Sequence, residues 1–116
     1  MNIKVGTDIL NKNRFLDSYK HSGENFLEKI FTPQEVRDNT IDQLASIFCL
    51  KEAIVKALEL PHSSWLSIST MRKHNGKLAC SFLDQTLARQ IISLDTSISH
   101  EEEMIIAVCS VIMDNK

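Results

Sequence analysis

Several features that would assign the chain to a common class of protein are missing from its 116 residues. The three cysteines, Cys49, Cys80 and Cys109, are odd in number and widely spaced, which argues against both a disulfide framework and a zinc site. No segment reaches the roughly 18 apolar residues of a membrane span. The N-terminal segment lacks the apolar run of a signal peptide. We therefore expect a cytoplasmic protein with reduced cysteines and no membrane partner.

The signatures of nucleotide and nucleic-acid chemistry are missing as well. The sequence has no P-loop, G-x-G-x-x-G turn or G-x-S-x-G elbow, so it lacks the motifs of P-loop ATPases, Rossmann enzymes and α/β-hydrolases. The formal net charge is -2, which gives no overall positive field to attract nucleic acid. Charge is unevenly distributed along the chain, and one short stretch is basic. This basic cluster consists of Lys12, Arg14, Lys20 and His21. It is either a docking patch for an acidic partner or a solvated face.

The composition that remains is that of an ordinary globular protein, with 43% hydrophobic and 24% charged residues, and the length suits one domain over residues 1–116. The longest helical pattern covers residues 41–60, where apolar residues recur at helical spacing until Pro61. Thr32, Pro33 and Glu35 have the order of an N-cap, a first helical residue and a capping-box partner.

Shorter elements surround the long helix. We expect short helices over residues 13–20, 24–31 and 84–90, and strands over residues 3–10, 67–71, 78–82, 91–98 and 104–113. His74-Asn75-Gly76-Lys77 is a hairpin turn signal between the second and third strands. Helices alternate irregularly with strands, without the rhythm of a parallel doubly wound sheet. The predicted fold class is therefore α+β, with an antiparallel sheet packed against one long helix and several short helices.

Three charged side chains interrupt apolar patterns. Asp8 lies within an apolar strand, and because burying a bare carboxylate is costly, it is paired, bound to a ligand or capping a turn. Glu52 and Lys56 lie four residues apart on the long helix and share a face, as an exposed ion pair or as part of a site. Asp8 with Glu52 suits magnesium, which takes one or two carboxylates together with waters and substrate phosphates. Lys56 could then neutralise phosphate charge.

A polar segment before the last strand holds a further candidate. His100 either lies in a plain turn or donates to a phosphate or carries a proton. The segments that carry chemistry follow one another as Gly6-Thr7-Asp8-Ile9-Leu10, Arg14-Phe15, residues 26–35, residues 48–58, Asn75-Gly76-Lys77 and Ser97-Ile98-Ser99-His100. In this order and spacing they resemble the holo-acyl-carrier-protein synthases, a family of 4'-phosphopantetheinyl transferases. Residues 48–58 are similar to that family's F-x-x-K-E-A-x-x-K-A helix.

The resemblance implies an enzyme that transfers the phosphopantetheine arm of coenzyme A to a serine of an apo acyl carrier protein, in fatty acid or polyketide biosynthesis, and releases adenosine 3',5'-bisphosphate. It implies that Asp8 and Glu52 are magnesium ligands and that Lys56 holds developing negative charge. Glu52 would also take the serine proton, directly or through a water. The residues implied in binding coenzyme A are Lys51, Lys56, Ser99 and His100.

The resemblance also implies partners. Arg14 matches an arginine with which the family grips the acidic carrier protein, and Lys20 extends that patch by charge. Short members of the family with one copy of the motifs are homotrimers with active sites between subunits, so a homotrimer is implied here.

The chain departs from the family at three places. Ile47 stands where arginine or tryptophan is common, residues 59–64 replace a Gly-Thr-Gly type turn, and Asn11 stands where an acid often follows the first strand. These changes favour a specialised enzyme that serves a dedicated carrier protein. One alternative is a degenerate relative that binds carrier protein or coenzyme A without transfer. Another is a structural subunit, which leaves the charges on the long helix unexplained.

Overall fold

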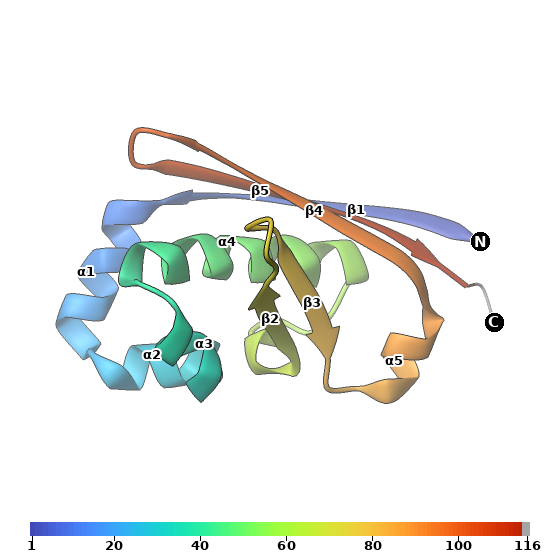
Figure 1. The fold of residues 1–116 in the computed structure, drawn as a ribbon, viewed down its shortest axis with the longest axis horizontal. Helices are drawn as coiled ribbons and strands as arrows, with labels where there is room; N and C mark the ends of the chain where they lie inside the picture. Colours follow the sequence, from blue (N-terminus) through green and yellow to red (C-terminus); the bar gives the residue numbers. More distant parts are fainter. Residues whose placement is uncertain (115–116) are drawn as a thin grey trace.

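The computed structural model describes residues 1–114 and confirms the α+β class (Figure 1). Every predicted helix and strand is present, and most boundaries shift by no more than two or three residues. The elements are β1 (Asn2–Asn11), α1 (Lys12–Ser22), α2 (Glu24–Ile30), α3 (Pro33–Asp38), α4 (Ile41–Leu58), the 3-10 helix η1 (Trp65–Ser67), β2 (Ile68–Arg72), β3 (Leu78–Phe82), α5 (Gln85–Gln90), β4 (Ile91–Glu101) and β5 (Met104–Met113). No helix within residues 1–114 is long and apolar enough to cross a membrane.

The strands form two antiparallel sheets instead of the single sheet that the sequence suggested. One has the order β1-β5-β4 and the other is the β2-β3 hairpin. Figure 1 shows the three-stranded sheet along one side of α4, with α2, α3 and the hairpin on the other side. The hairpin is fixed there because the backbone N–H of Thr70 on β2 donates to the Glu35 carboxylate on α3, at 3.0 Å. The long helix is thus covered from both sides.

Helix α4 provides more of the core than any other element, and its ends have clear causes. Thr40 and Gln43 form a capping box at its start. The helix ends at Leu58, two residues before the predicted end, because Glu59 adopts a left-handed conformation with φ 53°. The N–H of Leu60 then donates to the carbonyl of Val55 at 3.0 Å, which satisfies one of the last helical carbonyls.

The three-stranded sheet buries only one of its faces. On β5, Ile105, Ala107, Cys109 and Val111 alternate inward and are almost fully buried against α4. The residues between them point outward, where apolar side chains remain exposed. The exposed apolar residues of this outer face are Ile3, Val5, Ile9, Ile106 and Val108.

Strand β1 approaches α4 so closely that only glycine fits at position 6. A Cβ atom on Gly6 would meet the carbonyl oxygen of Ala53 and lie 2.5 Å from the backbone nitrogen of Ala57. Both atoms belong to the backbone of α4, so neither can move aside as a flexible side chain could. The glycine therefore sets how near the strand lies to the helix.

We predict that Gly6→Ala lowers the free energy of unfolding by about 3 kcal/mol, because overpacking a contact with backbone forces strand and helix apart. Urea denaturation followed by circular dichroism measures this. Ser81→Ala, which places the same residue at an exposed position of β3, serves as the control. Equal unfolding midpoints for the two variants would contradict the close approach.

Candidate active site

The close approach at Gly6 brings Asp8 to α4. Asp8 lies two residues beyond Gly6 on the same face of β1, and its carboxylate accepts a hydrogen bond of 2.9 Å from the ammonium of Lys56. The same ammonium donates to the carbonyl of Thr7 at 3.1 Å. The Asp8 side chain is 17% exposed and that of Lys56 is 56% exposed, so the pair lies at the surface and is open to a ligand.

Glu52 belongs to the same cluster but does not share an ion pair with Lys56 among the described residues, so the sequence-based alternative of an exposed Glu52–Lys56 pair is wrong. The hydrogen bond to Asp8 raises the pKa of Lys56, and the charges of Asp8 and Glu52 add to this. The indole N–H of Trp65 donates to one carboxylate oxygen of Glu52 at 3.3 Å. The structure thus brings Asp8, Glu52 and Lys56 together from β1 and α4.

The donor set of this cluster fits magnesium. Two carboxylates with hard oxygen atoms stand beside a cation, and magnesium typically binds one or two carboxylates and takes its other ligands from water and substrate phosphates. Within residues 1–114 no group of three or more His, Cys, Asp or Glu side chains comes together to hold a metal on its own. The two carboxylates fit a magnesium ion whose other ligands come from water and from a phosphate-bearing substrate.

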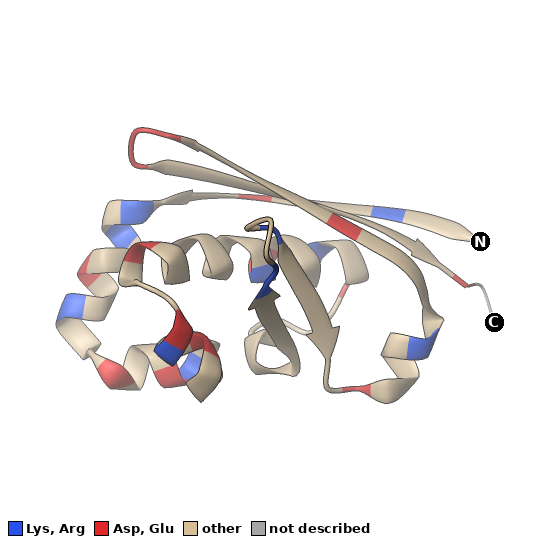
Figure 2. Cartoon of the chain, viewed as in Figure 1, with Lys and Arg blue, Asp and Glu red and all other residues tan. Residues whose placement is uncertain are grey.

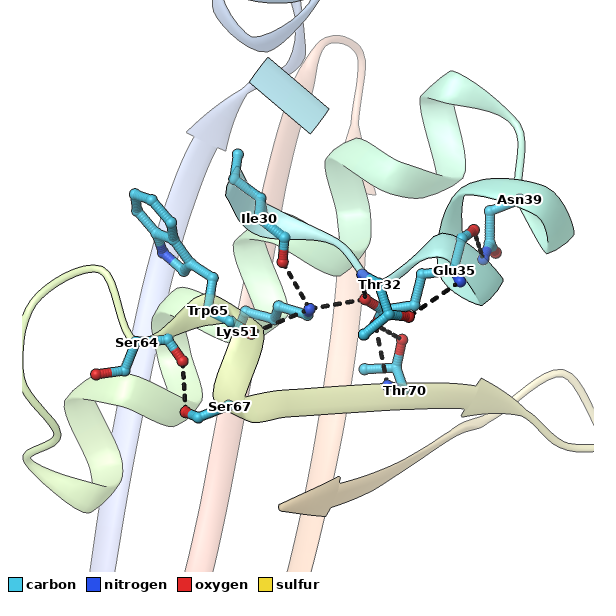
Figure 3. A network of polar contacts seen from close by, with 9 residues as sticks. All are labelled: Ile30, Thr32, Glu35, Asn39, Lys51, Ser64, Trp65, Ser67 and Thr70. Carbon is cyan, nitrogen blue, oxygen red and sulfur yellow. Dashed lines mark hydrogen bonds and ion pairs between the residues drawn. The ribbon is translucent and has the colours of Figure 1, made fainter. Parts of the chain in front are cut away.

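Lys51 lies away from this cluster, and its predicted role in binding coenzyme A is not supported. Its side chain is fully buried, and its ammonium donates to Ile30 O at 2.8 Å, to Glu35 Oε1 at 2.8 Å and to Trp65 O at 3.2 Å (Figure 3). A lysine ammonium has three donors, and all three are used. Burial lowers the pKa of Lys51, against the raising effect of Glu35. Lys51 is a structural residue, although Glu52 beside it faces the cluster.

A second candidate region is a cleft of about 340 Å³ between the hairpin turn and β4. It is lined by the basic residues Arg72, Lys77 and His100 together with Ser97. Figure 2 shows basic segments at the end of β2 and in the turn of the hairpin, in addition to those on other elements such as α1 and α5. The sequence indicated His100 and the turn that contains Lys77, but it assigned no ligand role to Lys77 and did not single out Arg72, which precedes the turn. A cleft with these cations suits an anionic ligand.

Ser99 and His100 point to opposite sides of the sheet, since successive residues of a strand alternate. His100 pairs with Ile105, which is buried on the α4 side, and Ser99 pairs with Ile106, which is exposed on the outer face. The side chain of His100 therefore faces the cleft. Ser97 pairs with the exposed Val108, so its side chain, like that of Ser99, points to the outer face.

Comparison with known proteins identifies the family. The family model of the 4'-phosphopantetheinyl transferase superfamily matches residues 4–109. The chain belongs to this superfamily. It is 34% identical over 111 residues to the holo-[acyl-carrier-protein] synthase of Dehalococcoides mccartyi. The aligned region covers 90% of this chain and 93% of that protein. The resemblance noted in the sequence is therefore confirmed.

Solved structures agree with this assignment to the 4'-phosphopantetheinyl transferase superfamily. The holo-[acyl-carrier-protein] synthase of Helicobacter pylori, in complex with coenzyme A, matches with a TM-score of 0.82 and 28% identity, over 93% of this chain and 99% of that one. The synthase of Neisseria meningitidis matches with a TM-score of 0.82 and 27% identity, over 94% and 97% of the two chains.

Two departures from the superfamily pattern have structural consequences here. Ile47 is fully buried in the core, so this position contributes packing and no charge to a ligand. Glu59 takes the left-handed conformation that glycine usually provides after a helix, and it forms an ion pair with Lys4 of β1. The turn after α4 is thus held by a contact to β1 and not by glycine.

The residues expected to contact a carrier protein lie on α1. Arg14 and Lys20 are both exposed. They are six residues apart, which separates them by about 120° around the helix axis. His21, seven residues from Arg14, shares its face of the helix more closely. The basic patch around Arg14 is therefore built with His21 more than with Lys20.

Cysteine chemistry plays no part in this site. Burial and, after it, the nearby Asp8 raise the pKa of Cys49 to about 12. Burial likewise raises the pKa of Cys80 to about 12 and that of Cys109 to about 11. Near neutral pH these thiols stay protonated, and a protonated thiol is a poor nucleophile.

The assignment of Lys51 as a structural residue leads to a prediction. Lys51→Met leaves Glu35 buried without its cation, and removing one partner of a buried ion pair costs about 3 kcal/mol or more. Lys56→Met, whose ammonium is 56% exposed, should change stability by less than about 1 kcal/mol. Thermal or urea unfolding compares the two. If Lys51 instead contacted coenzyme A, Lys51→Met would weaken coenzyme A binding at unchanged stability.

Proposed function

We propose that the chain is a magnesium-dependent 4'-phosphopantetheinyl transferase. It transfers the phosphopantetheine arm of coenzyme A to a serine of an apo acyl carrier protein. The observation that carries this proposal is the Asp8–Lys56–Glu52 cluster in a chain whose relatives are named holo-[acyl-carrier-protein] synthases. A protein that only docked a carrier protein would have no use for two carboxylates placed around one exposed lysine.

In the proposed reaction the hydroxyl oxygen of the carrier serine bonds to the phosphorus that bears the pantetheine. The bond from that phosphorus to the bridging oxygen of the pyrophosphate breaks, and adenosine 3',5'-bisphosphate leaves. Glu52 takes the proton of the serine hydroxyl. Lys56 stabilises the negative charge that grows on the phosphate oxygens, which is the main task of protein groups in phosphoryl transfer.

Asp8 and Glu52 would hold the magnesium, which supplies Lewis-acid polarisation of the phosphate oxygens when bound. The side chains of these residues come from a rigid strand and a rigid helix. Their positions are thus set before substrate binds, which is what charge stabilisation in a transition state needs.

The hairpin cleft is the proposed site for the nucleotide part of coenzyme A. Arg72, Lys77 and His100 offer donors to phosphate there. The Helicobacter pylori structure in complex with coenzyme A supports a coenzyme A site on this fold. Ser99 faces the other side of the sheet, so we retain His100 and not Ser99 in this role.

We further propose that residues 1–116 act as one domain in the cytoplasm. In this proposal Arg14, with Lys20 and His21 nearby, attracts the acidic carrier protein toward α1. The charges on the exposed side of this helix favour encounter with an acidic surface.

The transfer reaction is tested by intact-mass spectrometry of an apo acyl carrier protein incubated with the protein, coenzyme A and magnesium. We expect the carrier to gain one phosphopantetheine and the gain to stop when magnesium is removed. Asp8→Asn should reduce the rate by about 100-fold, because it weakens the metal site. Asp38→Asn, the same change at an exposed acid of α3, is the matched control and should keep the rate.

No mass gain with several carrier proteins would contradict the transfer function. Calorimetry with coenzyme A would then show whether the chain is the binding protein considered above.

We also propose a homotrimer with active sites between subunits. Two observations support it. The outer face of the three-stranded sheet exposes apolar residues, of which Ile9 and Ile106 are paired across β1 and β5 and are 63% and 43% exposed, and such patches mark interfaces. In addition, Asp8 lies on β1 and His100 on β4, which are the opposite edges of that sheet. A neighbouring subunit can place its cleft against the Asp8 edge, and repetition of this contact closes a ring.

A mixing experiment tests whether the site is shared. Asp8→Asn and His100→Ala are each expected to be inactive at low coenzyme A concentration. When the two are refolded together, a shared site needs one intact residue from each neighbour, so about one quarter of the sites should recover in random trimers. Each variant refolded alone is the control. No recovery in trimers that native mass spectrometry shows to be mixed would place Asp8 and His100 of one site in the same chain.

A further inference from the structure

Trp65 connects two neighbouring residues of α4 that have different roles. Its indole N–H donates to Glu52 Oε1 at 3.3 Å, and its backbone carbonyl accepts from Lys51 Nζ at 3.2 Å. Because Lys51 and Glu52 are adjacent in the chain, these two hydrogen bonds join Trp65 of η1 to two consecutive residues of α4. Figure 3 shows the Trp65 ring extending away from the Lys51 ammonium.

The ring of Trp65 is fixed by packing as well. It contacts Phe48, which lies one helical turn before Glu52, with ring centroids 5.7 Å apart at 62°. Edge-to-face contacts of this kind hold aromatic rings in a defined orientation. The indole therefore spans one turn of α4, from Phe48 to Glu52.

The other end of the connection is anchored in the buried ion pair. Glu35 accepts from Lys51 at 2.8 Å and from the Thr70 hydroxyl at 2.6 Å, and neither Lys51 nor Glu35 is exposed. A buried pair with every donor and acceptor used is rigid. The carbonyl of Trp65 is thus bound to an ammonium that is fully buried and donates to three acceptors.

We propose that Trp65 is a positioning residue that holds the Glu52 carboxylate in place for the metal and substrate. The proposal rests on the function proposed above. A glutamate has three rotatable side-chain bonds, so an unsupported carboxylate would lose conformational entropy on binding a metal. The indole N–H occupies one acceptor position of the carboxylate and leaves the remaining lone pairs for other ligands.

The test uses Trp65→Phe, which keeps an aromatic ring against Phe48 and the backbone carbonyl for Lys51 but removes the indole N–H. We expect Mn²⁺, measured by electron paramagnetic resonance in the presence of coenzyme A, to bind about 10-fold more weakly. The magnesium concentration for half-maximal rate should rise by the same factor, whereas kcat at saturating magnesium should change little. The melting temperature should stay close to that of the unchanged protein.

A merely structural role gives a different result. If Trp65→Phe binds Mn²⁺ as the unchanged protein does, the positioning role is wrong, whatever happens to stability. If the unchanged protein itself binds no Mn²⁺ with coenzyme A, the proposed metal-dependent function fails, which is a separate outcome.

A second measurement needs no variant. Trp65 is the only tryptophan of the chain, so its fluorescence reports on the surroundings of Glu52 in the unchanged protein. Because Mn²⁺ quenches fluorophores that lie close to it, Mn²⁺ with coenzyme A should quench the emission over the concentration range in which it binds. Binding of Mn²⁺ without any change in emission would overturn the placement of the metal beside Glu52 and Trp65.

Discussion

The contact between β1 and α4 at Gly6 is the constraint on which the candidate site depends. A strand and a helix usually pack through their side chains, which keeps their backbones well apart. Here the missing Cβ lets the strand lie against the backbone of Ala53 and Ala57. Asp8, two residues further along the strand, then reaches the ammonium of Lys56. A larger residue at position 6 would move Asp8 away from α4 and separate the carboxylate from the lysine.

Two adjacent residues of α4 show how position on a helix decides whether a charged side chain is buried or lies at the surface. Lys51 points into the protein, where Glu35 neutralises its charge and three acceptors replace water. This arrangement fixes α3, η1 and β2 around the helix, and it stabilises the fold only as long as both partners remain. Glu52, rotated by about 100°, faces the cluster at the surface. Of these two adjacent residues, Lys51 thus stabilises the fold, whereas the carboxylate of Glu52 is available to bind a ligand.

Much of this was accessible from the sequence, and the errors have physical causes. Local signals were sufficient for the elements: the capping box at Thr32 and Glu35, the hairpin turn around Gly76 and the apolar strand β5 all appear in the structure. Sequence periodicity does not show which side chain pairs with a buried charge. The sequence therefore places Lys51 among the residues that bind coenzyme A, whereas in the structure it pairs with Glu35. Residues distant in sequence, such as Arg72 and His100, come together only through the fold.

The placement of the two candidate regions would link assembly to catalysis in the proposed trimer. In the sheet order β1-β5-β4, the cluster of Asp8, Glu52 and Lys56 has its Asp8 on one edge strand, and the cleft lies at the other edge. The outer face of the same sheet leaves apolar residues such as Val5 and Val108 exposed, at 64% and 39%. In the proposed trimer, burial of this face would supply free energy for association, and the same contact would bring one chain's cleft to its neighbour's cluster. In the proposed trimer a lone subunit would therefore have both parts of the site but no complete site, and its activity would follow the concentration of assembled protein.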